Sequence, residues 1–133
     1  MAQEITKSVK DMVAEANARI TTIPTEEAIA LVGSPDHVFV DLRDIRELQR
    51  GGKVPGAFSC PRGMLEFWID PASPYHKEVF AEDKTFVFYC ASAWRSALST
   101  LVAQEMGLKP VAHVEGGFSA WTKAGGPVET VER

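Results

Sequence analysis

The sequence predicts an α/β protein with a mostly parallel sheet, because short apolar runs alternate with helical stretches. Three runs have the length of strands and cover residues 37–40, 85–89 and 111–114. The run at 85–89 is apolar almost throughout, which is typical of a strand covered on both faces. A helical stretch separates the last two runs, and a strand, a helix and a strand at this spacing form a parallel crossover.

Two helices are predicted before the first run. Residues 1–20 are predicted to form an N-terminal amphipathic helix, because apolar residues recur every three to four positions at Ile5, Val9, Val13, Ala16 and Ile20. Its acidic and basic residues balance in number, so the helix has little electrostatic attraction to an anionic membrane. We expect this helix to pack on its own domain or on a second copy in a homodimer. Residues 21–133 form the main domain, in which Thr25 is expected to cap a second helix that stops at Gly33.

Two more helices are predicted in the second half of the chain. The first lies between residues 89 and 111, ends before Gly107 and carries an apolar stripe formed by Leu98, Leu101, Val102 and Met106. The last helix is expected to start from a tight turn at Gly116 and Gly117, with Trp121 pointing inward.

The composition excludes several classes of protein. With 14 basic and 18 acidic residues, the formal net charge is −4, so there is no electrostatic attraction for nucleic acid. No stretch has the ~20 consecutive apolar residues of a membrane span. The N-terminus lacks the pattern of a secretory signal, so a cytoplasmic location is expected. Two cysteines exclude a disulfide scaffold, and the three histidines show no ligand spacing, so no metal or other cofactor is predicted.

Cys90 is the strongest candidate for chemistry, because it directly follows the run at 85–89. Ligands of parallel sheets bind beyond the carboxyl ends of the strands. The short loop after Cys90 leads into a helix, and both loop amides and a helix N-terminus favour an anion such as a thiolate, the nucleophilic form of cysteine. Arg95 adds a positive charge suited to an anionic substrate or leaving group. The candidate loop residues are Ala91, Ser92, Ala93, Trp94, Arg95 and Ser96.

The alternative for a cysteine after an apolar strand is a buried side chain without chemistry. This interpretation is favoured for Cys60, whose neighbours provide no helix N-terminus. A role for Cys60 as a second, resolving thiol that reacts with Cys90 is the other alternative.

The loop Cys90-Ala-Ser-Ala-Trp-Arg-Ser96 resembles the active-site loop of the rhodanese-like (thiosulfate sulfurtransferase-like) single-domain family. Two more segments resemble signatures of this family, in the same order along the chain. The first is Val40-Asp-Leu-Arg-Asp-Ile-Arg-Glu47 with Lys53-Val-Pro-Gly-Ala57, and the second is Val114-Glu-Gly-Gly-Phe-Ser-Ala-Trp121 with Ala124-Gly-Gly-Pro-Val128. The matches span residues 22–128, so only the N-terminal segment is clearly extra.

The resemblance implies a five-stranded, mostly parallel sheet flanked by helices, and a cysteine that carries sulfane sulfur as a persulfide. Cys90 would take sulfur from a donor such as thiosulfate or a small persulfide. It would pass the sulfur to an acceptor such as cyanide or a thiol. The loop amides would surround the persulfide sulfur.

The length of the loop favours sulfur transfer over phosphate chemistry. Four residues separate Cys90 from Arg95, whereas the related dual-specificity and tyrosine phosphatases have five, which makes room for a phosphate ester. A cysteine-dependent phosphatase or arsenate reductase remains one alternative. A non-catalytic persulfide carrier or binding module is the other.

Some residues depart from the family pattern, which limits the prediction of the substrate. The loop lacks the basic residue that thiosulfate-specialised members often carry, so a doubly charged donor finds only Arg95. Ala93 stands where many members have glycine, and its Cβ is expected to exclude a comfortable positive φ. Trp94 either shields the sulfur or stacks on an acceptor, or it is a lid on the surface.

Three residues outside the loop are candidates for positioning the substrate. Arg62 would supply positive charge if its segment borders the pocket, and the alternative is a solvated surface arginine. In the resemblance, Asp41 and Arg43 look like an ion pair beneath the loop, which is favoured over direct catalysis.

Overall fold

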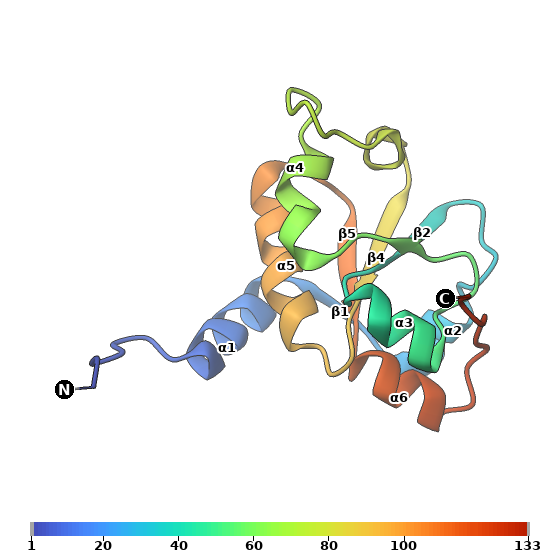
Figure 1. Ribbon diagram of the computed structural model, residues 1–133, viewed down its shortest axis with the longest axis horizontal. Coiled ribbons are helices and arrows are strands. Elements are labelled where there is room, and N and C mark those ends of the chain that lie inside the picture. Colours follow the sequence, from blue (N-terminus) through green and yellow to red (C-terminus); the bar gives the residue numbers. More distant parts are fainter. Residues whose placement is uncertain (1, 133) are drawn as a thin grey trace.

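The structure, a computed structural model, describes residues 2–132 and contains one five-stranded sheet with helices on both faces (Figure 1). The strand order is β1-β5-β4-β2-β3, and all neighbouring strands are parallel. The strands are β1 (Thr21–Ile23), β2 (His37–Asp41), β3 (Phe58–Ser59), β4 (Thr85–Tyr89) and β5 (Val111–Val114). The predicted α/β class and five-stranded sheet are therefore confirmed. Residues 1 and 133 of the predicted ranges lie outside the described residues.

Side chains of the central strands alternate between two apolar layers, as strand geometry requires. Phe86 and Phe88 face one layer, and Val87 and Tyr89 face the other. Helices cover both layers. They are α1 (Val9–Arg19), α2 (Thr25–Ile29), α3 (Ile45–Gly51), α4 (Leu65–Ile69), α5 (Trp94–Met106) and α6 (Gly117–Lys123), with two short 3-10 helices at Arg62–Met64 and Glu78–Ala81. Residues of α4 and α5 contribute to the first layer, and residues of α2 and α6 to the second.

The N-terminal helix is shorter than predicted, because it begins only at Val9. Ser8 caps it: the Ser8 hydroxyl accepts a hydrogen bond of 3.0 Å from the Asp11 backbone N–H. Ile5 precedes the helix and is exposed. Through Val13 and neighbouring residues, α1 packs on α5 of the same chain (Figure 1). No helix within residues 2–132 is long and apolar enough to cross a membrane.

The predicted bounds of the second helix were also wrong. The capping position is Pro24, and Thr25 is the first helical residue. The Thr25 hydroxyl instead donates a hydrogen bond of 2.9 Å to the Glu115 carbonyl, which ties α2 to the end of β5. The helix ends at Ile29, and Gly33 lies in the turn that follows it.

The buried face of α5 differs from the predicted apolar stripe. Small residues face inward there, which allows the helix to lie close to its neighbours: Ser96, Ala97, Ser99, Thr100 and Ala103 are buried. Leu98 and Leu101, from the predicted stripe, pack beside α1, and Met106 is exposed. The predicted end of the helix is confirmed, because Gly107 caps it in the left-handed conformation.

Candidate active site

Cys90 lies where β4 ends and the loop to α5 begins, and its side chain is buried. The carbonyl of the preceding residue, Tyr89, accepts a hydrogen bond of 3.0 Å from the Leu42 N–H, which joins this strand end to β2. The backbone N–H of Ser96, in the first turn of α5, donates to Cys90 Sγ at 3.3 Å. The sulfur thus lies at the N-terminal, positive end of a 13-residue helix.

Backbone N–H groups at the start of α6 form hydrogen bonds to the first two carbonyls of the loop. The Phe118 N–H donates to the Cys90 carbonyl at 2.7 Å, and the Ser119 N–H donates to the Ala91 carbonyl at 3.0 Å. In a planar trans peptide, N–H and C=O point in opposite directions. The N–H groups of Ala91 and Ser92 therefore point away from α6. No residue within 2–132 accepts a hydrogen bond from either group, so both can bind an anion.

This approach of α6 requires a glycine at position 117. Gly117 has a φ of 64°, and a Cβ there would lie 2.6 Å from the Cys90 carbonyl oxygen and 2.7 Å from that of Ala91. The predicted tight turn at Gly116 and Gly117 is confirmed, and so is the burial of Trp121 in the helix that follows. The turn is therefore part of the site as well as part of the fold.

Ala93 adopts a positive φ of 76°, contrary to the prediction that its Cβ would exclude one. The reason is its position: Ala93 caps α5, and its carbonyl accepts the first helical hydrogen bond from the Ala97 N–H at 3.1 Å. The chain must turn sharply there to leave the loop and enter the helix. Closing the loop around Cys90 imposes this conformation on a residue that carries a Cβ.

Arg95 is not a free cation, because its guanidinium binds the carboxylate of Glu47. Nη1 and Nη2 of Arg95 each donate to one Glu47 oxygen at 2.9 Å. Glu47 also accepts a hydrogen bond of 2.9 Å from the Asp44 N–H, in the capping box that begins α3. The hydrogen bonds from Arg95 are the largest cause that lowers the pKa of Glu47 to about 2. The pair thus fixes the start of α5 to the start of α3.

Glu47 is a residue of the site that sequence reasoning missed. Its spacing from Asp44 is the signature of a capping box and predicts a helix start. Nothing in that local pattern indicates a partner 48 residues away in the chain.

Asp41 and Arg43 form a buried ion pair that supports the site from below. Arg43 Nη2 donates to Asp41 Oδ2 at 2.8 Å and also to the Gly52 carbonyl at 2.7 Å. The Arg43 guanidinium carbon lies 4.3 Å from the centroid of the Phe118 ring. Because Phe118 belongs to the helix start that holds the Cys90 carbonyl, this network supports the loop from α6.

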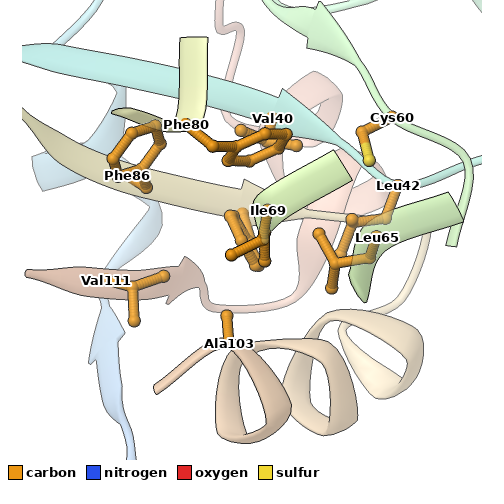
Figure 2. Packing of buried hydrophobic residues seen from close by; sticks show 10 residues of the cluster. Val40, Leu42, Cys60, Leu65, Ile69, Phe80, Phe86, Ala103 and Val111 are labelled. Atoms are coloured by element: carbon orange, nitrogen blue, oxygen red, sulfur yellow. The ribbon is translucent and has the colours of Figure 1, made fainter. Parts of the chain in front are cut away.

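Neither Arg62 nor Cys60 lines the hollow beside the cysteine loop. Arg62 donates to Glu66 at 2.8 Å and lines a hollow between α1 and α5 rather than a surface next to Cys90. Cys60 lies in the apolar cluster with Leu42 and Leu65 (Figure 2). Burial raises the pKa of Cys60 to about 12, so this thiol is protonated and weakly nucleophilic near neutral pH.

A hollow of about 310 Å³ lies beside the cysteine loop. Its lining includes Ser92, Ala93 and Trp94 of the loop and helix start, His113 of β5, and residues of α1 and β1. Trp94 lines this hollow and is exposed. Within residues 2–132, no group of three or more His, Cys, Asp or Glu side chains is arranged to hold a metal ion.

His113 is the second site residue that sequence reasoning missed. It is buried, its Nδ1 lies 2.8 Å from the Ser96 hydroxyl oxygen, and its Nε2 lies 3.2 Å from that of Thr22. The histidine therefore adjoins the residue whose N–H binds Cys90 Sγ. No spacing in the sequence indicates this contact.

Comparison with known proteins identifies the family. Residues 24–124 match the sequence profile of the rhodanese-like domain. The chain belongs to the rhodanese-like domain family. Residues 2–23, which contain α1 and β1, lie outside the matched part of this rhodanese-like chain.

Three similar proteins match this chain to different extents. A protein of unknown function from Rhodopseudomonas palustris, described as a possible tyrosine phosphatase, has 62% identity and a TM-score of 0.95, covering 97% of this chain and 99% of that one. A sulfurtransferase of Allochromatium vinosum is 26% identical over 77% of this chain and 87% of its own length. An uncharacterised protein of Synechocystis sp. is 33% identical over 68% of this chain, which spans 45% of that protein's length.

Proposed function

We propose that this rhodanese-like domain is a sulfurtransferase in which Cys90 carries the transferred sulfur as a persulfide. The observation that carries the proposal is the geometry around Cys90 Sγ. One N–H at the start of α5 binds the sulfur, and the nearby N–H groups of Ala91 and Ser92 are held ready for an anion by α6. Such a cradle stabilises first the thiolate and then the terminal sulfur of a persulfide.

The reaction proceeds in two nucleophilic steps. The Cys90 thiolate attacks the outer sulfur of the donor, a new S–S bond forms, and the bond between that sulfur and the donor breaks. The leaving group departs with the bonding electron pair, as sulfite from thiosulfate or as a thiolate from a persulfide. An acceptor thiol or cyanide then attacks the terminal sulfur, and Cys90 leaves as the thiolate.

The paired charges at the site favour a donor with little negative charge. Each arginine considered for binding an anionic donor is paired with a carboxylate: Arg95 with Glu47, Arg62 with Glu66 and Arg43 with Asp41. These pairs leave the loop amides as the principal attraction for an anion. A dianion such as thiosulfate is repelled by the Cys90 thiolate without a compensating free cation. A persulfide with at most one negative charge is therefore the favoured donor.

Phosphate ester hydrolysis is the competing activity, because the Rhodopseudomonas palustris protein is described as a possible tyrosine phosphatase. Two features weigh against it here. Only four residues separate Cys90 from Arg95. In addition, both terminal nitrogens of Arg95 are bound to Glu47 instead of being directed at a phosphate.

The test is the intact mass of the protein after incubation with thiosulfate, cysteine persulfide or mercaptopyruvate. We expect Cys90 to gain the mass of one sulfur atom, most completely with cysteine persulfide. Cys90→Ser should abolish the gain, whereas the matched variant Cys60→Ser should retain it. Failure of every donor to modify Cys90 would disprove sulfur transfer, and hydrolysis of p-nitrophenyl phosphate by the wild type but not by Cys90→Ser would support the phosphatase.

A further inference from the structure

His113 forms a bridge between β1 and the cysteine loop. Its ring lies on β5, next to Thr22 of β1 in the parallel register, and is almost completely buried. Its two nitrogens have different partners: Nε2 lies 3.2 Å from the Thr22 hydroxyl oxygen, and Nδ1 lies 2.8 Å from that of Ser96. Both nitrogens are therefore occupied, and neither is free to take a proton from a substrate.

The ring is neutral near neutral pH. Burial lowers the pKa of His113 to about 4, and among residues 2–132 no carboxylate opposes this effect. Two titratable groups lie near the ring: Cys90, which is linked to it through Ser96, and Glu115, which lines the hollow beside the cysteine loop. The residues that α1 and β1 contribute to this hollow, Val13, Asn17 and Thr22, are uncharged. A neutral imidazole donates from one nitrogen and accepts at the other. A hydroxyl can take either role, so Thr22 and Ser96 match the ring in both tautomers.

Ser96 connects the His113 ring to the Cys90 sulfur. Its hydroxyl is bound to His113, and its backbone N–H is the donor 3.3 Å from Cys90 Sγ. Ser96 belongs to the first turn of α5 and is buried, so a fixed side chain also restrains the direction of its N–H. We propose that His113 is a positioning residue for the Cys90 sulfur, acting through Ser96. This inference rests on the proposed role of Cys90 as the nucleophile.

The bridge also connects the site to the part of the chain outside the family match. Thr22 precedes residue 24, where the match to the rhodanese-like domain begins. Val13 and Asn17 of α1 line the hollow in which His113 and Ser92 lie. Both α1 and β1 thus contribute to the environment of the loop, α1 through Val13 and Asn17 and β1 through the contact of Thr22 with His113.

The experiment measures the rate of iodoacetamide alkylation of Cys90 against pH, by peptide mass spectrometry, in the wild type and in variants. His113→Leu removes both ring contacts at similar volume. We expect it to slow alkylation near neutral pH about tenfold and to raise the pH midpoint of alkylation by about one unit, because the hydrogen bond to the thiolate weakens. Ser96→Ala keeps the N–H and removes the hydroxyl, so a smaller loss in the same direction is expected.

A conservative variant of His113 and a double variant distinguish a positioning role of His113 from a general effect on the fold. The amide of Asn can occupy the place of the ring Nδ1, so His113→Asn should recover most of the lost rate. The double variant with His113→Leu and Ser96→Ala should lose little more than His113→Leu alone. His37→Leu is the matched control, because His37 Nδ1 also lies 2.8 Å from a serine hydroxyl oxygen, that of Ser34, but at the opposite end of the sheet. It should leave alkylation unchanged.

The possible outcomes distinguish this proposal from the proposed function. Folded His113→Leu and Ser96→Ala variants with the wild-type rate and midpoint would overturn the positioning role, even if Cys90 still forms a persulfide. Independent, additive losses would overturn it as well. A wild-type protein that takes sulfur from no donor would refute sulfur transfer, while the alkylation data would still decide the role of His113.

Discussion

Replacing Glu47 by glutamine removes one charge of the ion pair at the loop and keeps the shape of the side chain. Two hydrogen bonds of 2.9 Å from Arg95 lower the pKa of Glu47 from 4.5 to about 2. In the absence of solvent screening, a shift of this size corresponds to about 3 kcal/mol. The Glu47 and Arg95 side chains are 24% and 41% exposed, so water screens much of the interaction. We therefore expect Glu47→Gln to lower the free energy of unfolding by about 1–2 kcal/mol near neutral pH.

The pH dependence of this loss follows from the lowered pKa. A carboxylate with a lower pKa in the folded state contributes its full stability above the pKa of the unfolded state, and the contribution disappears as pH falls through the folded pKa. The difference between wild type and Glu47→Gln should thus be constant from pH 5 upward. It should shrink between the pKa values of 4.5 and about 2. Urea unfolding followed by tryptophan fluorescence at several pH values measures it.

The same variant tests the argument about donor charge. Freeing Arg95 should raise kcat/KM for thiosulfate relative to cysteine persulfide, by about fivefold if ~1 kcal/mol of attraction for the dianion is gained. Glu66→Gln is the matched control, because it breaks the pair with Arg62 away from the loop. An unchanged donor ratio in Glu47→Gln, together with a stability difference that does not depend on pH, would refute the reasoning.

Three further predictions concern the loop and the second cysteine. Gly117→Ala should destabilise the protein by about 2–4 kcal/mol in urea unfolding and reduce sulfur loading of Cys90, because its Cβ would meet two carbonyl oxygens of the loop at 2.6 and 2.7 Å. Ala93→Gly should raise the free energy of unfolding by about 0.5–1 kcal/mol, since glycine adopts the observed φ of 76° without strain. With its pKa raised to about 12, Cys60 should remain unmodified by iodoacetamide in the folded protein at pH 8, where peptide mapping should find only Cys90 alkylated.

Local patterns were sufficient to predict the central elements of the fold. The runs at 85–89 and 111–114 form β4 and β5 with the predicted bounds, and the run at 37–40 extends by one residue into β2. The outer strands β1 and β3 have only three and two residues, too few for a periodic signal. The first helix begins only after Ser8, which caps it through a side-chain hydrogen bond, and the spacing of apolar residues does not indicate such a contact.

By itself, the sequence determined that Cys90 ends a buried strand, that a short loop leads from it into a helix, and that a glycine turn begins the last helix. These features depend on neighbours in the chain, so they are visible in the order of residues. The tertiary structure decided which charges and hydroxyls meet at the loop. Glu47 reaches Arg95 across 48 positions, and His113 reaches Ser96 across 17. Such pairs form only because parallel strands bring their carboxyl ends to one edge of the sheet. For the same reason Arg95, which was predicted to bind an anionic substrate, is instead paired with the carboxylate of Glu47.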